Sequence, residues 1–343
     1  MRKLLNTLYV TTPEAYLALD GENVVIRHEE ATLGRVPLHT LEGIVAFNYP
    51  GASPALMGAC AERGVDLCFF TPNNRFLARV SGAVRGNVLL RRTQHEWARD
   101  DAKCLEISRH LVTGKVYNQK WVIERTLRDH AERVDAPKLR EVSRKLSGYL
   151  GMLAACADVD TLRGMEAVAA SAYFGVFDEL ILGDKGSFSF RGRSRRPPLD
   201  RVNALLSFCY ALLAREAAAA LEGVGLDPYV GFMHADRPGR ASLALDLMEE
   251  MRAPLADRFV LSLINRRMVD PKQFSVKENG AVMMDDALRR ALLTGWQSKK
   301  QETLSHPFLE EKITWGMVPH AQALLLSRFL RGDLDGYPPF LWK

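Results

Sequence analysis

Met165-Glu166-Ala167-Val168-Ala169-Ala170-Ser171-Ala172-Tyr173-Phe174 is a helical stretch with one charged residue and apolar neighbours on every side. A helix that is apolar all round is buried, so this stretch predicts a helical core. Burying a carboxylate is unfavourable unless the group is paired or bound to a metal. Glu166 is therefore a candidate functional residue, and the alternative is a solvated surface glutamate.

Helical periodicity extends from this stretch in both directions. It begins near Gln94, where Gly and Pro become sparse, and further helical material is expected after Thr303. Residues 94–343 should therefore form the larger domain, which is almost entirely α-helical. The expected helices are 95–112, 115–130, 137–157, 161–182, 202–221 and 243–251.

Residues 1–93 have a different character, with short β-branched or aromatic runs separated by turns. Asp20-Gly21-Glu22-Asn23 predicts a hairpin, because Asp-Gly tolerates positive φ. The fold class is thus α+β, with a small β-rich N-terminal domain before the helical one. The expected strands are 16–19, 24–26, 43–47, 65–71 and 76–80, with a turn at Pro72-Asn73-Asn74 and one helix, 55–63, ending at Gly64.

The composition is that of an ordinary soluble globular protein. The 343 residues are 47% hydrophobic and 25% charged, and the formal net charge of +5 is too small to indicate a partner. Five cysteines without CxxC spacing favour reduced thiols over zinc fingers or iron–sulfur clusters. These are Cys60, Cys68, Cys104, Cys156 and Cys209.

Neither a signal peptide nor a membrane span is indicated. Asn6 and Thr7 interrupt the apolar N-terminal run, and no small-residue cleavage site follows. No segment approaches the roughly 18 uninterrupted apolar residues of a membrane span. The expected location is the cytoplasm, without membrane association.

His234 is a second candidate functional residue. It follows the apolar stretch Tyr229-Val230-Gly231-Phe232-Met233 and precedes a break at Pro238-Gly239. A core histidine bonded to a backbone carbonyl is the alternative. The position at the exit of an element favours a functional group.

A third group of candidates has helical spacing. Ser242 is the expected N-cap of a helix in which Asp246, Glu249 and Glu250 share one face. Such like charges are unfavourable unless a cation faces them, and an acidic solvent face is the alternative. Together with Glu166, one imidazole and these carboxylates are the ingredients of a divalent-metal site.

A cationic loop follows the segment that carries Glu166. Its arginines are interleaved with Gly, Phe and Pro, and arginine offers forked donors that suit phosphate oxygens. A solubilising loop is the alternative, but cations beside a metal site suit an enzyme acting on phosphodiesters. Walker A, GxGxxG, HExxH and GxSxG motifs are absent from the sequence. The basic residues are Lys185, Arg191, Arg193, Arg195, Arg196 and Arg201.

Four stretches, in matching order and spacing, resemble the Cas-one family of CRISPR-associated spacer integrases. They are Arg195–Ser207 (RRPPLDRVNALLS), Gly225–His234 (GLDPYVGFMH), Gly239–Glu250 (GRASLALDLMEE) and Arg85–Arg91 (RGNVLLR). The resemblance covers nearly the whole chain. The C-terminal region is similar to members from type I-C systems.

This resemblance implies a β-rich N-terminal domain, with dimerisation and DNA-backbone contact as its roles, and an α-helical catalytic domain. It implies that Glu166, His234 and Glu249 bind Mg²⁺ or Mn²⁺ and that Asp246 supports them, whereas Glu250 has no assigned role. The candidate contacts to double-stranded DNA are Arg191, Arg193, Arg195, Arg196, Arg201 and Asn203.

The resemblance further implies an integrase and endonuclease of CRISPR adaptation. The 3′-hydroxyl of a short foreign DNA, the prespacer, attacks a phosphodiester at the edge of a CRISPR repeat. The expected assembly is two homodimers around a central dimer of the small ferredoxin-like subunit Cas-two, and a RecB-like Cas nuclease trims the DNA. A structure-selective nuclease without integration and a nonenzymatic DNA-binding scaffold are the alternatives.

Overall fold

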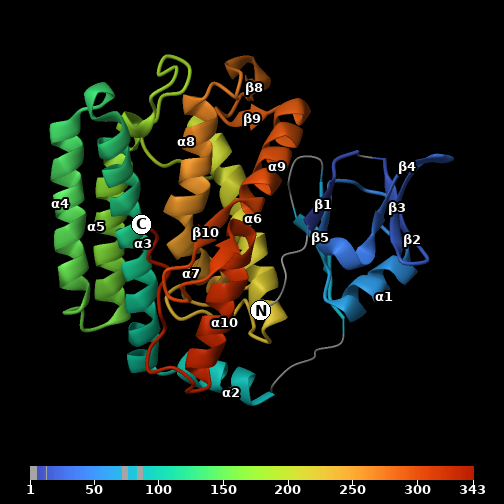
Figure 1. Ribbon diagram of the computed structural model, residues 1–343, viewed down its shortest axis with the longest axis horizontal. Coiled ribbons are helices and arrows are strands. Elements are labelled where there is room, and N and C mark those ends of the chain that lie inside the picture. Colours follow the sequence, from blue (N-terminus) through green and yellow to red (C-terminus); the bar gives the residue numbers. More distant parts are fainter. Residues whose placement is uncertain (1–5, 13, 72–75, 83–87) are drawn as a thin grey trace. The chain divides into compact units, whose positions relative to one another are not determined.

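The computed structural model describes residues 6–12, 14–71, 76–82 and 88–343 (Figure 1), and the chain divides into two compact units. The first unit is formed by residues 1–86 and 290–300, and the second by residues 87–289 and 301–343. The boundary expected between residues 93 and 94 lies within α2 (Val88–Trp97). The different roles expected for residues 1–93 and 94–343 stay predictions. The motif at Arg85 and the turn at Pro72 fall largely outside the described residues.

The first unit contains two sheets. In one, β5 (Leu41–Ala46) pairs in parallel with β1 (Asn6–Val10) and with β6 (Asp66–Phe70), and β6 pairs antiparallel with β7 (Phe76–Val80). The other is an antiparallel meander of β2 (Tyr16–Asp20), β3 (Asn23–His28) and β4 (Ala31–Pro37). The predicted β-rich character and the hairpin at Gly21, whose φ is +57°, are confirmed.

One helix, α1 (Pro54–Arg63), lies in this unit as predicted. The Ser53 side chain caps its start by accepting a hydrogen bond from the Leu56 N–H, and Gly64 ends it in the left-handed conformation, with φ of 68°. Leu56 packs with the buried faces of both sheets, where Leu17, Ile44 and Leu67 are fully buried.

The second unit is mainly helical, and this confirms the predicted fold class. Its longest helix, α3, packs against α4, α5 and α7, and α6 packs against α7 and α10 (Figure 1). A π-helical turn, Arg252–Asp257, joins α7 to α8. The helices are α2 (Val88–Trp97), α3 (Asp101–His130), α4 (Ala136–Leu153), α5 (Val159–Gly175), α6 (Arg201–Gly223), α7 (Ser242–Met251), α8 (Arg258–Asn265), α9 (Asp286–Gln301), which is shared between the units, and α10 (Val318–Leu330).

Short strands and 3₁₀ turns complete the described chain. Two hairpins were not predicted from the sequence: β8 (Phe274–Val276) with β9 (Val282–Met284), and β10 (Thr303–Ser305) with β11 (Lys312–Thr314). The 3₁₀ turns are Leu38–Thr40, Ala131–Arg133, Phe177–Leu180, Pro271–Gln273 and Trp315–Met317. The helical material expected after Thr303 is thus limited to α10 and one such turn.

Three local predictions were wrong. The helix expected at 161–182 ends at Gly175 as α5, and the 3₁₀ turn Phe177–Leu180 follows it. The two helices expected at 95–112 and 115–130 are one continuous α3 across Gly114. A Cβ on Gly114 would lie 2.9 Å from Cγ of Glu250, so this glycine allows close packing with α7 and does not break the helix. Ser242 is not the N-cap of α7 but lies in its first turn, where its buried hydroxyl is 3.3 Å from the Ala235 carbonyl oxygen.

Among the described helices, α6 alone has the length and apolar composition of a membrane span. Over half of its most apolar window, 56%, is buried inside the fold. Its contacts with α7 and α10 identify it as the central core helix of the second unit.

Candidate active site

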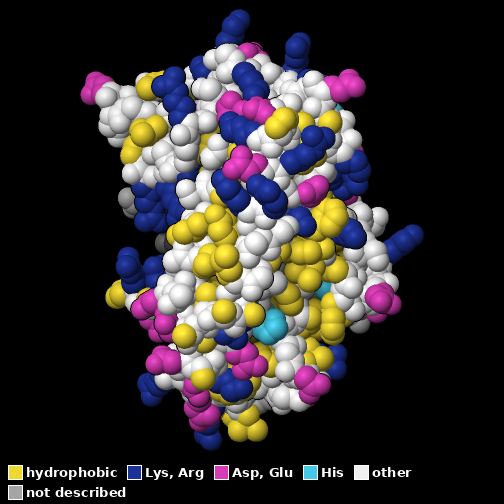
Figure 2. Space-filling view, turned by 90° about the vertical axis from the view of Figure 1, so that its left-hand side faces the viewer, with side chains coloured by type: hydrophobic (Ala, Val, Ile, Leu, Met, Phe, Trp, Pro, Cys, Tyr) yellow, Lys and Arg dark blue, Asp and Glu magenta, His cyan; other side chains and the backbone are white. Residues whose placement is uncertain are grey.

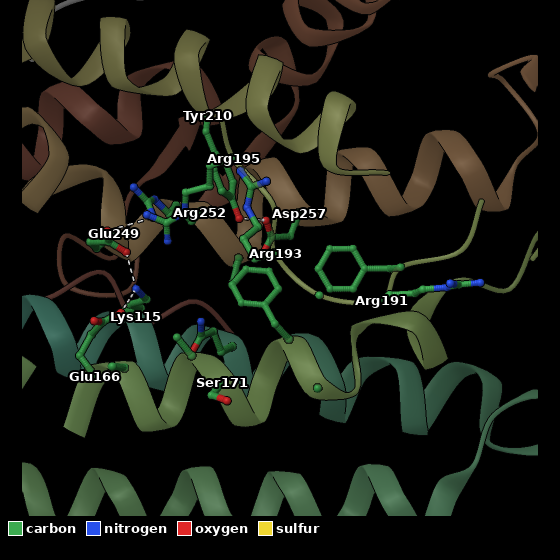
Figure 3. Close-up of a pocket in the computed structure, with 18 residues that line it drawn as sticks. Lys115, Glu166, Ser171, Arg191, Arg193, Arg195, Tyr210, Glu249, Arg252 and Asp257 are labelled. Atoms are coloured by element: carbon green, nitrogen blue, oxygen red, sulfur yellow. Dashed lines mark hydrogen bonds and ion pairs between the residues drawn. The ribbon is translucent and has the colours of Figure 1, made fainter. Parts of the chain in front are cut away.

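Three helices of the second unit present charged side chains to one point. Glu166 projects from α5 and Glu249 from α7, and Lys115 comes from α3, which packs between them (Figure 3). Asp158 fixes the start of α5 by accepting a hydrogen bond from the Thr161 N–H at 2.7 Å. The side chain of Glu166 is 21% exposed and that of Glu249 only 3%. The burial predicted for the stretch that carries Glu166 is wrong in part, because α5 buries Ala169 and Tyr173 but leaves Val168 49% exposed and Glu166 only half-buried. Glu249, by contrast, is almost completely buried.

The Lys115 ammonium joins the two carboxylates. Its Nζ lies 2.7 Å from Oε2 of Glu249 and pairs with Oε1 of Glu166 (Figure 3). The Lys115 side chain is itself only 8% exposed. Two carboxylates thus coordinate a single cation in a nearly dry environment, where charge interactions are strong.

A second cation faces the other oxygen of Glu249. A guanidinium nitrogen of Arg252 lies 3.1 Å from its Oε1. Burial alone would raise the pKa of Glu249, but Arg252 and Lys115 outweigh burial and lower that pKa to about 2. Glu249 is consequently ionised at any physiological pH.

Asp246 holds His234 in place. Its Oδ2 accepts hydrogen bonds from the N–H groups of Phe232 (2.8 Å) and Met233 (3.0 Å), and its Oδ1 accepts one from the His234 N–H (3.0 Å). The same Oδ1 lies 2.6 Å from His234 Nδ1. Since Nδ1 is engaged by a fully buried carboxylate, Nε2 is the nitrogen oriented for a ligand. The supporting role expected for Asp246 stays a prediction.

The predicted ligands are brought near one another but not into one cluster. In the part of the chain that the structure describes, no group of three or more His, Cys, Asp and Glu residues is arranged to hold a metal ion. Glu166 and Glu249 converge on Lys115, whereas His234 pairs with Asp246. His234 is still close enough to contribute to the lowered pKa of Glu249. Two carboxylates around a cation and an oriented imidazole fit a divalent ion chemically, and the ligand triad stays a prediction.

The acidic solvent face considered for α7 is wrong, because Asp246, Glu249 and Glu250 are all buried. Glu250 accepts hydrogen bonds from the Tyr337 hydroxyl (2.8 Å) and the Phe340 N–H (2.6 Å) in the segment after α10. Burial raises the pKa of Glu250 to about 8. Its surroundings make Glu250 a structural group.

A cavity of about 530 Å³ extends from the carboxylates toward the loop after α5 (Figure 3). Along α5 its wall is made of small or aromatic side chains, and five cations line it. At its far end Asp257 accepts hydrogen bonds from the hydroxyls of Tyr210 (2.5 Å) and Tyr173 (3.0 Å), and burial raises the pKa of Asp257 to about 6. The cations are Lys115, Arg191, Arg193, Arg195 and Arg252.

The cationic loop contains two kinds of residue. Arg193 donates hydrogen bonds to Oδ1 of Asn203 (2.6 Å) and to the Ser194 carbonyl (2.7 Å), and Arg201 donates to the Ser187 carbonyl (2.8 Å). Asn203 is fully buried. These three residues shape the loop in this structure, and their predicted DNA contacts stay predictions.

Arg191, Arg195 and Arg196 are exposed, which favours them as the phosphate contacts of the loop. Figure 2 shows one face of the molecule, on which Lys and Arg side chains gather in the upper part among acidic ones. On this face, the basic side chains are therefore more concentrated in one region than in the rest.

Among the polar or charged residues that line the cavity, sequence reasoning missed Lys115, Gln119, Tyr210, Arg252 and Asp257. Two of them had a usable signal. Lys115 is the lone cation between Arg109 and Lys120 in a mostly apolar helix, and Arg252 follows Glu249 at the i+3 spacing of a helical ion pair.

The chain matches known proteins over its full length. The family model described as CRISPR associated protein Cas1 matches residues 8–298. The chain is 49% identical over 343 residues to "CRISPR-associated endonuclease Cas1 1" of Chlorobaculum tepidum, with 100% of both chains covered. It is 50% identical over 347 residues to "CRISPR-associated endonuclease Cas1 2" of Rhodospirillum rubrum, again with 100% of both covered. A "CRISPR-associated exonuclease Cas4/endonuclease Cas1 fusion" of Geobacter sulfurreducens is 33% identical, over 98% of this chain and 60% of the fusion.

Solved structures share the fold. A casposase bound to an integration product matches with a TM-score of 0.83 and 22% identity, over 98% of this chain and 93% of the casposase. A chain of a Cas6-RT-Cas1–Cas2 complex matches with a TM-score of 0.81 and 20% identity, over 100% of this chain and 36% of that chain. At these identities the likeness concerns the fold alone.

Proposed function

The chain belongs to the Cas1 family of CRISPR-associated endonucleases and integrases of CRISPR adaptation, and we propose that Glu166, His234 and Glu249 form the metal site of this enzyme. The observation that carries the proposal is the convergence of Glu166 and Glu249 on one ammonium group at the end of a cationic cavity. A buried and a half-buried carboxylate that already share a cation are suited to a divalent ion.

The proposed reaction is strand transfer, in which the 3′-hydroxyl of a prespacer attacks the phosphorus of a phosphodiester at the edge of a CRISPR repeat. The ester bond to the prespacer forms as the bond from phosphorus to the 3′-oxygen of the repeat strand breaks, and that strand leaves with a 3′-hydroxyl after taking up a proton. Glu166, His234 and Glu249 would hold a divalent ion, which would lower the pKa of the attacking hydroxyl and stabilise charge on the reacting phosphate. With water in place of the 3′-hydroxyl, the same site is an endonuclease.

Each residue then has a defined task. Glu166 and Glu249 provide oxygen ligands and His234 provides a nitrogen, a mixed set that suits Mn²⁺ at least as well as Mg²⁺. Asp246 fixes the imidazole ring through Nδ1, as carboxylates commonly do for metal-binding histidines. The exposed Arg191, Arg195 and Arg196 hold DNA phosphates beside the cavity.

The proposed assembly is a homodimer that joins Cas2 and acts on double-stranded prespacer and repeat DNA in the cytoplasm of a type I-C system. The shared fold with a Cas1–Cas2 complex and with a DNA-bound casposase supports Cas2 and DNA as partners. The relative fused to a Cas4 exonuclease supports a separate trimming nuclease. The β-rich unit is the proposed site of dimerisation and DNA-backbone contact.

The test mixes the protein with its Cas2 partner, a prespacer, a plasmid carrying a CRISPR repeat, and Mn²⁺. Joining of prespacer to plasmid is expected for the unmodified protein and for Glu141→Ala, a control at an exposed glutamate on α4. Joining should vanish in Glu166→Ala and His234→Ala. Cleavage without joining by the unmodified protein would instead favour a plain nuclease, and full activity of both variants would reject the proposed site.

A further inference from the structure

Lys115 occupies the point at which the two proposed ligand carboxylates meet. We propose that its ammonium is the resident cation of the site, which holds Glu166 and Glu249 together before a metal binds and competes with the metal for them. This inference rests on the proposed function, because it concerns the same carboxylates. It makes Lys115 a positioning residue that also sets the affinity of the site for divalent ions.

The contacts of Lys115 link its own helix to two others. Its Nζ reaches Glu249 Oε2 at 2.7 Å and also pairs with Glu166, so that one side chain of α3 connects α5 and α7. Lysine is seldom buried without a partner, and this one is 8% exposed with two. Its charge therefore balances carboxylates that would otherwise repel each other.

The two oxygens of Glu249 have different cations. Oε1 lies 3.1 Å from a guanidinium nitrogen of Arg252, which is three residues further along the chain. Oε2 faces Lys115 and is thereby directed toward Glu166. A divalent ion bridging the two glutamates would need this Oε2 oxygen, so that its position overlaps that of the ammonium.

A metal ion and the ammonium cannot both keep these contacts, because two cations at such a short distance repel strongly in a buried site. Lys115 can move without disturbing α3, since its charge is carried on a flexible four-carbon stem. The cavity beside the carboxylates is lined by both Lys115 and Gln119, one turn apart, and it provides the space for the displaced ammonium. Metal binding should thus be coupled to a rotation of this side chain.

The competition predicts opposite effects of one substitution on two measurements. Without Lys115 the metal-free protein has buried carboxylates that lack their shared cation, so its thermal stability falls. A divalent ion then meets no competitor and binds more tightly, by roughly tenfold or more. A residue with only a structural role would instead lower both stability and metal affinity.

The experiment titrates MnCl₂ into the purified full-length protein by calorimetry and records thermal unfolding with EDTA or with Mn²⁺. Lys115→Met should bind Mn²⁺ about tenfold more tightly than the unmodified protein, unfold at a lower temperature in EDTA, and recover at least the normal unfolding temperature with saturating Mn²⁺. Lys115→Gln, which keeps a polar group, provides a second variant should Lys115→Met fail to fold. Lys103→Met, on the same helix but paired with Glu106, should leave Mn²⁺ affinity unchanged.

Equal or weaker Mn²⁺ binding by Lys115→Met and Lys115→Gln would overturn the inference while leaving the proposed metal site intact. Absence of Mn²⁺ binding by the unmodified protein would overturn the proposed function itself. The two failures are therefore distinguishable in one titration series.

Discussion

Glu249 and Glu250 are neighbours on α7, and both are buried, but their side chains enter different surroundings. Glu249 lines the cavity between two cations, Lys115 and Arg252, which lower its pKa to about 2 despite its burial. Glu250 packs against the segment after α10, where its partners are uncharged donors and burial raises its pKa to about 8.

The comparison separates a functional carboxylate from a structural one. Both residues have the same chemistry and the same degree of burial, so their neighbours alone determine the charge that each carries. The ionised Glu249 is suited to hold a cation, whereas Glu250, with its raised pKa, fastens the segment after α10 to α7. Divergent pKa values of this kind identify the roles of paired carboxylates in enzymes generally.

The largest expected effect on the joining rate comes from removing the negative charge of Glu249, which faces the cavity. Glu249→Gln should lower the rate of Mn²⁺-dependent prespacer joining on the order of 10³-fold, because a neutral amide is a poor metal ligand and leaves Lys115 and Arg252 unbalanced. The rate is measured from the time course of joined product at saturating DNA. A rate within tenfold of normal would show that Glu249 is not a ligand.

A smaller effect is expected at Asp246, which acts through His234. Asp246→Asn should lower Mn²⁺ affinity or the joining rate by about 10–100-fold, since the imidazole loses the carboxylate that orients it. Titration calorimetry and the joining assay measure the two quantities. Restoration of the rate at high Mn²⁺ concentration would confirm a positioning role, and a loss as large as that of Glu249→Gln would argue for direct ligation by Asp246.

The protonation of Glu250, which contacts the segment after α10, is tested by the pH dependence of stability. The folded-state pKa of Glu250, about 8, lies above the ordinary glutamate value of 4.5, so the folded protein binds a proton that the unfolded chain releases. The free energy of unfolding should therefore fall as pH rises from about 4.5 to about 8, by at most about 1.4 kcal/mol per pH unit. Glu250→Gln should lack this contribution.

Urea unfolding in EDTA at several pH values measures the contribution of Glu250. This contribution is the difference in free energy of unfolding between the unmodified protein and Glu250→Gln. A difference that does not change with pH would mean that Glu250 is ionised in the folded protein. The comparison between Glu249 and Glu250 would then fail.

The smallest effect is expected on the exposed loop. Arg195→Gln and Arg196→Gln should each weaken DNA binding only severalfold and reduce the slope of log affinity against log salt by about one. Fluorescence anisotropy with labelled duplex DNA at several salt concentrations measures both quantities. Arg144→Gln, at an exposed position on α4, is the matched control. An unchanged slope in both loop variants would reject the loop as a phosphate-binding element.

Local signals in the sequence predicted much of the fold. The hairpin at Gly21 and the end of α1 at Gly64 were found because each needs a backbone conformation that glycine adopts readily. Gly114 was misjudged by the same logic, since its role is to admit Glu250 from another helix. Contacts between distant segments of the chain carry no local signature, so this packing role was not visible.

The same limit applies to the candidate site. A cation facing Asp246 and Glu249 was expected because like charges on one helix face are unfavourable without one. Their actual partners could not be deduced: Lys115 meets Glu166 from 51 residues away in sequence. The spacing of Glu249 and Glu250 suggested one shared acidic face. In the fold, Glu249 packs against α3 and Glu250 against the segment after α10, so the two carboxylates have different environments.

The position of a bound metal in crystals of the protein grown with MnCl₂ tests the proposed metal site most directly. Anomalous scattering at the manganese edge should give a peak within about 2.5 Å of carboxylate oxygens of Glu166 and Glu249 and of Nε2 of His234, with the Lys115 ammonium moved into the cavity. A peak at another location, or a site at which Lys115 still bridges the two glutamates in saturating Mn²⁺, would contradict it.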